Sequence, residues 1–131
     1  MGVGRFRLGC LFVATLFFSL TTQAADRGLY QSYGLGNKSC GRFVAAKDGA
    51  QTSEIDESDR FAMLSWVQGY LTRYNVSSPD TYSITGNTDT DGIELWLYNY
   101  CKANPLLSIS DGAEVLVLTL RPNRLIHAPK S

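Results

Sequence analysis

The chain has 131 residues, and its twelve Lys and Arg balance its twelve Asp and Glu, so the formal net charge at pH 7 is zero. This length is enough for one compact domain and too short for two. A chain without excess positive charge lacks the electrostatic footprint of nucleic-acid binding, and no basic amphipathic stretch is present that would bind a membrane surface.

Residues 1–24 have the pattern of a secretory signal peptide. Arg5 and Arg7 give a positive start, an apolar run follows, and small residues precede a cleavage site after Ala24. A transmembrane helix needs about 20 apolar residues, which is more than this run provides. A lipoprotein signal is the other alternative, but Cys10 precedes the apolar run instead of following it. We therefore expect a periplasmic or secreted protein without stable membrane insertion.

Two cysteines remain after such a cleavage, Cys40 and Cys101. The compartment would be oxidising and the domain small, so this pair predicts a single structural disulfide. On the loop-entropy model, closing about 60 residues of chain contributes about 4 kcal/mol to the free energy of unfolding. Catalytic thiols are the alternative, but neither cysteine lies in a C-x-x-C pair, and the only histidine, His127, falls in the expected C-terminal tail.

The first part of the exported chain is expected to be irregular. Residues 25–38 are rich in Gly, Tyr and Ser and show no periodicity, which indicates a lead-in segment. A short helix is predicted from Ser39, with Gly49 as its end. The acidic, polar residues 51–59 indicate a loop.

A longer helix is predicted over 59–76, because apolar residues recur there at helical spacing. Its main stripe consists of Phe61, Leu64, Val67 and Leu71. An adjacent aromatic stripe, at steps of four, consists of Trp66, Tyr70 and Tyr74. Gly69 is expected to let another backbone approach this helix.

Two further helices are predicted before Pro122. One begins near 88–91, where Thr and Asp side chains can cap it, and its apolar positions are Ile93, Trp96, Leu97, Tyr100 and Cys101. Pro105 ends it. The next begins at Ser108, which has the spacing of a capping box with Asp111. Residues 114–120 also have β-propensity, but a lone strand has no partner, so a helix is preferred.

The predicted fold class is therefore all-α. The helices form a small four-helix orthogonal bundle over 39–121, cross-linked by one disulfide. A cleaved signal peptide precedes it, and a flexible tail follows over 122–131.

One segment has a partial metal-binding pattern. Asn87, Asp89 and Asp91 place oxygen ligands at alternate positions before a glycine, as in a calcium loop, but the twelfth position is Tyr98 and the bidentate Glu is missing. Helix capping explains the same residues.

Asp89, Asp91 and Glu94 are also candidates for an acid and base pair, as in a small hydrolase. Capping and solvation are again the simpler interpretation, so we expect no metal, no cofactor and no enzymatic activity.

Aromatic residues are the remaining candidates for function. Rings with polar tips suit a protein interface as well as a core. The candidate partner-binding residues are Trp66, Tyr70, Tyr74 and Trp96. Packing in the core is the alternative for most of them.

The order of these motifs resembles the HdeA/HdeB family of small periplasmic proteins and the wider helical group that includes the Rap/Tai-type immunity proteins. The resemblance rests on a Ser-Cys-x-x-Phe start, a Gly-Tyr-Leu helix and a cysteine before an Asn-Pro helix stop. These are Ser39, Cys40 and Phe43, then Gly69, Tyr70 and Leu71, and finally Cys101, Asn104 and Pro105.

The resemblance implies an exported, non-catalytic domain that binds another protein. In the chaperone branch, acid dissociates a homodimer and exposes apolar surface that holds unfolding clients. In the immunity branch, the domain binds and inhibits an antibacterial effector enzyme of the type VI secretion class. The chain departs from the first branch in being richer in Trp and Tyr and poorer in Lys, and from the second in lacking a further cysteine pair. The single disulfide favours the chaperone branch.

Overall fold

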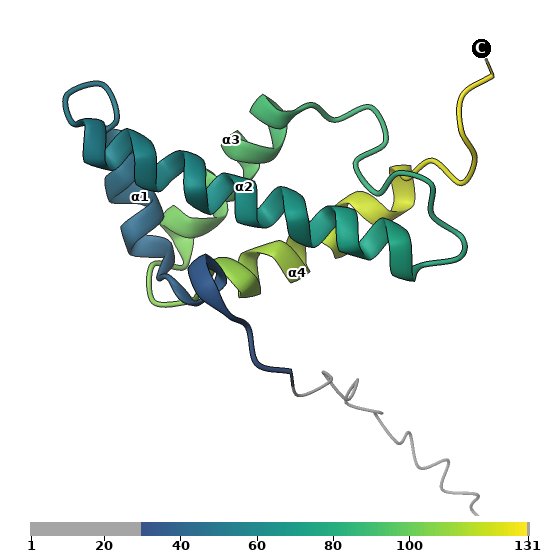
Figure 1. Cartoon of the computed structure of the whole chain (residues 1–131), viewed down its shortest axis with the longest axis horizontal. Coiled ribbons are helices and arrows are strands. Elements are labelled where there is room, and N and C mark those ends of the chain that lie inside the picture. The colour runs from purple at the N-terminus through teal and green to yellow at the C-terminus, as the bar shows by residue number, and fades with distance from the viewer. Residues whose placement is uncertain (1–29, 131) are drawn as a thin grey trace, which may run out of the picture. The chain divides into compact units, whose positions relative to one another are not determined.

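The computed structural model describes residues 30–130, of which residues 31–130 belong to one compact unit (Figure 1). The predicted signal peptide over 1–24 lies outside the described residues. Four α-helices and two short 3-10 helices follow one another along the described chain: η1 (Gly34–Asn37), α1 (Cys40–Gly49), α2 (Glu54–Ser77), α3 (Thr90–Ala103), α4 (Ile109–Leu120) and η2 (Arg121–Asn123). Within residues 30–130 the only β-type pairs are two isolated bridges, so the all-α prediction is confirmed.

Side-chain caps decide where the helices begin. The hydroxyl of Ser39 accepts from the Arg42 amide at 3.2 Å and starts α1. The Asp89 carboxylate accepts from the Gly92 amide at 2.8 Å and starts α3. Ser108 and Asp111 form the predicted capping box of α4, and the strand alternative for 114–120 is wrong.

The predicted start of α2 is wrong by five residues. The helix begins at Glu54 because the Ser53 hydroxyl accepts from the Asp56 amide at 3.2 Å. Glu54, Asp56 and Glu57 lie in the first turn, where negative charge is favoured by the helix dipole. The acidic composition that indicated a loop is therefore the composition of a helix start.

The core is formed by apolar side chains from all four α-helices and from the segment before α3. The largest fully buried ones are Phe43, Met63, Ile84, Leu97, Ile109 and Leu116. Phe61 was expected in the α2 stripe, but it is 51% exposed, and the Arg60 guanidinium lies over its ring at 4.2 Å. Met63, and not Phe61, is buried in the core.

The longest of the described helices, α2, lies between two others. Both α1 and α4 pack against it (Figure 1).

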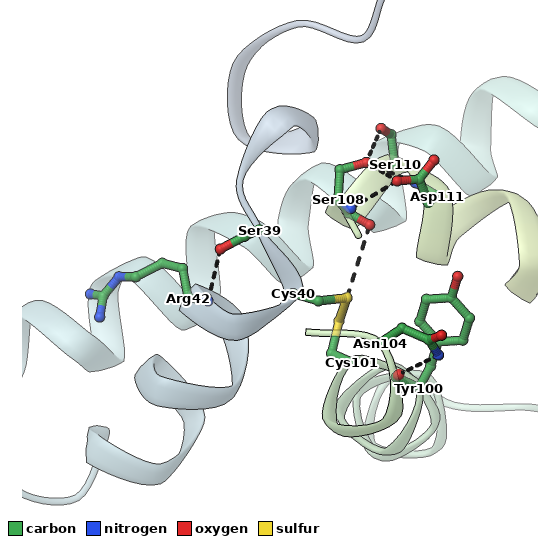
Figure 2. The surroundings of a disulfide bond; sticks show 9 residues. All are labelled: Ser39, Cys40, Arg42, Tyr100, Cys101, Asn104, Ser108, Ser110 and Asp111. Carbon is green, nitrogen blue, oxygen red and sulfur yellow. Dashed lines mark hydrogen bonds between the residues drawn. A yellow bond between two sulfur atoms is a disulfide. The ribbon is translucent and has the colours of Figure 1, made fainter. Parts of the chain in front are cut away.

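The Cys40–Cys101 disulfide joins the start of α1 to the end of α3, which confirms the predicted bond. Both cysteines are fully buried. Backbone bonds surround it: the Cys40 amide donates to Leu107 O at 2.8 Å, and the Gly41 amide donates to Pro105 O at 3.0 Å. Figure 2 shows the Cys40 sulfur beside the Ser108 carbonyl of the adjoining loop. The start of α1 is thus fixed to the end of α3 by the disulfide and to the α3–α4 connection by backbone hydrogen bonds.

The C-terminal segment differs from the loose tail that was expected. The Leu125 amide donates to Ser83 O at 2.9 Å, and the Tyr82 amide donates to Leu125 O at 2.8 Å. Arg124 also forms an ion pair with Asp80 at 2.6 Å. These contacts fix residues 124 and 125 to the segment that carries the buried Ile84.

Gly69 also differs from its expected role. It lies exposed on α2, and a Cβ atom built there meets no atom within 4 Å, so no other described segment approaches it.

We therefore expect Gly69→Ala to raise the free energy of unfolding by about 0.8 kcal/mol, because glycine inside an exposed helix costs about that much relative to alanine. Urea denaturation of the two proteins measures this difference. An unchanged or lowered midpoint would mean that something covers Gly69 in solution.

Candidate functional site

Glu94 is the one acidic side chain in the core of the described domain. It lies on α3 within the apolar stripe of Ile93, Leu97 and Cys101, and the residue is 6% exposed. A buried carboxylate is stable only when cations or hydrogen-bond donors compensate its lost hydration. The groups that pair with Glu94 therefore decide whether α3 can bury this face against the other helices.

Two cations from two other helices supply this compensation. Lys47 Nζ of α1 lies 2.7 Å from Glu94 Oε1, and Arg60 Nη1 of α2 lies 2.8 Å from the same oxygen. The Arg60 side chain is itself only 14% exposed. We call these three residues the Glu94 cluster. It joins α1, α2 and α3 through one carboxylate.

The pKa of Glu94 reflects opposing effects. Burial is the largest and raises the pKa, while the hydrogen bonds and positive charges of Lys47 and Arg60 lower it. The lowering effects together prevail, so the pKa lies below the ordinary value of 4.5. The folded protein therefore favours the ionised carboxylate.

An open cavity of about 540 Å³ borders the cluster. Lys47 and Arg60 line it together with Ala50, Gln51 and Glu57. Water and protons can therefore reach the two cations without prior opening of the domain.

Other polar contacts also join separate elements. Arg42 of α1 pairs with Asp56 at 2.8 Å and bonds to Asp59, both on α2. The Tyr98 hydroxyl of α3 donates to Asp48 of α1 at 2.6 Å, and this hydrogen bond raises the pKa of Tyr98, with burial adding to it. These contacts add polar links between α1 and α2 and between α1 and α3.

The four aromatic candidates pack partly against the core. Trp66 stacks on Tyr70 with ring centroids 5.7 Å apart, and Trp96 stacks on Tyr100 at 5.3 Å. The Trp66 indole donates to Tyr33 O at 3.0 Å, which attaches the lead-in segment to α2. Tyr74 is partly buried as well. Their role in binding a partner stays a prediction.

Of the three calcium candidates, one caps a helix and two lie exposed on the surface. Asp89 caps α3, while Asn87 and Asp91 are exposed. Over residues 30–130 the structure has no group of three His, Cys, Asp or Glu side chains placed to hold a metal ion. Glu94, grouped with Asp89 and Asp91 as an acid and base candidate, pairs instead with Lys47 and Arg60.

The sequence interpretation missed the Glu94 cluster. One signal was present, because Glu94 falls among the apolar positions of the most regular helix. Its partners are distant in sequence, and nothing in the spacing of Lys47 and Arg60 indicates that they meet there.

In the described part of the chain, no helix combines the length and apolar character needed to cross a membrane. Comparisons with protein-family models, with curated proteins and with solved structures found no match for this chain. Function is therefore inferred from its own residues and their geometry.

Proposed function

We propose that the protein is a non-catalytic, protein-binding domain of the periplasm that opens in acid and then holds unfolding proteins. The observation that carries this proposal is the Glu94 cluster, in which one buried carboxylate pairs with two cations from two other helices. The disulfide between two fully buried cysteines supports an oxidising compartment, because such bonds persist there.

Acid removes the charge on which the cluster depends. Because the pKa of Glu94 is lower in the folded state, the unfolded state binds the proton more readily. The stabilisation is fully present above the unfolded-state pKa and is lost as the pH falls through the folded-state pKa. Protonation then leaves Lys47 and Arg60 facing each other without their anion.

A second ion pair responds in the same direction. The hydrogen bond from Arg124 lowers the pKa of Asp80, so acid also weakens the attachment of the C-terminal segment to the loop before α3. This contact is exposed and contributes less than the buried cluster.

The disulfide limits how far the domain can open. It keeps α1 and α3 covalently joined after the ion pairs are lost, so the chain cannot expand freely. Apolar side chains such as Phe43 and Leu97 would become accessible in a compact, loosened state. Such a surface binds the apolar segments of other unfolding chains.

The test measures apolar-dye binding and suppression of client aggregation at pH 2 to 3 and at pH 7. We expect both to rise in acid and to reverse on neutralisation. A protein that binds no dye and holds no client at pH 2 would contradict the proposal.

An immunity protein is the second candidate, and one observation favours it. Leu106 is 96% exposed, although its loop is held by the backbone bonds of Cys40 and Gly41 to Leu107 and Pro105. A fixed, exposed leucine can enter the pocket of an enzyme with little loss of conformational entropy. Inhibition at pH 7 of a toxic enzyme encoded by a neighbouring gene would support this function, and such inhibition should be lost in Leu106→Glu.

A further inference from the structure

We propose that the groove between the second half of α2 and the segment leading into α3 binds an extended, uncharged peptide segment in the folded protein. The groove forms an open cavity of about 420 Å³. This binding belongs to the folded state at pH 7, so it does not depend on the opening in acid described above.

The two amide side chains of the groove are held by neighbouring groups. Gln68 Nε2 of α2 donates to Thr90 Oγ1 at 3.0 Å, which leaves Oε1 as an acceptor. Asn75 Oδ1 of α2 accepts from the Ile84 amide at 2.8 Å, which leaves the NH₂ group as a donor. Neither remaining group has a hydrogen-bond partner within residues 30–130. The groove therefore offers an oriented acceptor and an oriented donor.

The spacing of these groups matches an extended peptide. Gln68 and Asn75 lie seven positions apart on α2, so they share one face and are about 10 Å apart along the axis. Three residues of an extended chain also span about 10 Å. In an extended strand the N–H of one residue and the C=O of the residue two positions further on point to the same side, so one strand can donate to Gln68 and accept from Asn75 at the two ends of a three-residue stretch.

The rest of the groove favours a neutral peptide over other ligands. Its lining includes Leu71 and Ile93, which are only 3% and 4% exposed, so the groove offers little apolar surface and a bound peptide would be held mainly through its backbone. Among residues 30–130, Asp89 is the one charged residue that lines the groove, and its Oδ1 caps α3. None of the described lining residues is aromatic, so an oligosaccharide would find no ring on which to stack.

The experiment follows the side-chain NH₂ signals of Gln68 and Asn75 by NMR at pH 7 in the full secreted chain. The probe is an acetylated, amidated hexapeptide of alternating valine and serine. We expect saturable shifts of both signals, and no saturation with the same peptide methylated on its backbone nitrogens. Cellohexaose is the comparison ligand.

Two variants and one control complete the test. Gln68→Met keeps the size of the side chain and should weaken peptide binding about fivefold, the effect of one hydrogen bond. Thr88→Val, in the exposed lining of the groove, should weaken it less, and Ser65→Ala on the outer face of α2 should leave it unchanged. The absence of shifts, shifts with cellohexaose alone, or wild-type affinity in a folded Gln68→Met would overturn the proposal. Because all measurements are made at pH 7, none of these outcomes bears on binding in acid.

Discussion

Replacing Glu94 by Gln is expected to lower the free energy of unfolding by about 2 kcal/mol at pH 7, and by progressively less as the pH falls through the folded-state pKa of Glu94, which lies below the ordinary value. Removing one partner of a fully buried ion pair costs about 3–5 kcal/mol. We expect the smaller value because Lys47 and Arg60 line an open cavity, where water can solvate them after the carboxylate is gone.

The dependence on pH follows from the lowered pKa of Glu94. In the wild-type protein the cluster stabilises the fold fully at pH values above the unfolded-state pKa of Glu94. This stabilisation is lost as the carboxylate of the folded protein is protonated. The glutamine variant lacks this contribution at every pH. The two stability curves should therefore be separated at neutral pH and converge in acid.

Urea denaturation at a series of pH values measures both curves. Asp91→Asn is the matched control, because Asp91 lies on the same helix, three residues away, but is exposed. It should change the stability by less than about 0.5 kcal/mol, the effect of one charge at a helix start. Parallel curves for wild type and Glu94→Gln from pH 7 to pH 3 would contradict the role of the cluster.

Among the variants described, removal of the disulfide should lower the free energy of unfolding the most. The bond joins residues separated by 61 positions, and a closure of that length contributes about 4 kcal/mol on the loop-entropy model. A domain of this size has a total free energy of unfolding of about 5–15 kcal/mol. The double variant Cys40→Ser with Cys101→Ser is therefore expected to be close to unfolding at 37 °C.

Calorimetry and urea denaturation of the double variant measure this loss. Wild-type protein in excess reductant is the matched control, since it lacks the same bond without a change of residues in the core. The variant should also lose reversible binding of clients, because an acid-opened chain without the bond expands fully. Superimposable unfolding curves for the oxidised wild type and the variant would contradict this prediction. They would show that the backbone contacts around Cys40 stabilise the fold without the disulfide.

The parts of the fold that local patterns encode were predicted well. The apolar spacing of Ile93, Leu97 and Cys101 and the Ser108–Asp111 capping box each lie within a few residues of chain, so α3 and α4 follow from the sequence. The disulfide follows from the number of cysteines and from the expected compartment.

The features that were missed depend on contacts between distant residues or on competing local signals. Acidic residues after Ser53 fit both a loop and the first turn of a helix, and only the cap distinguishes the two. The pairing of Leu125 with Ser83 and of Glu94 with Lys47 exists only once the helices have packed. The aromatic candidates, which the sequence shows most plainly, pack partly against the core, and their role in binding a partner stays a prediction.

The most direct measurement compares two titrations of the same protein. One follows the carboxyl carbon shift of Glu94 by NMR, and the other follows apolar-dye binding over the same range of pH. We predict that Glu94 titrates below the ordinary pKa of 4.5 and that dye binding rises with the same midpoint. Dye binding that stays flat, or that rises while Glu94 is still fully ionised, would contradict the account.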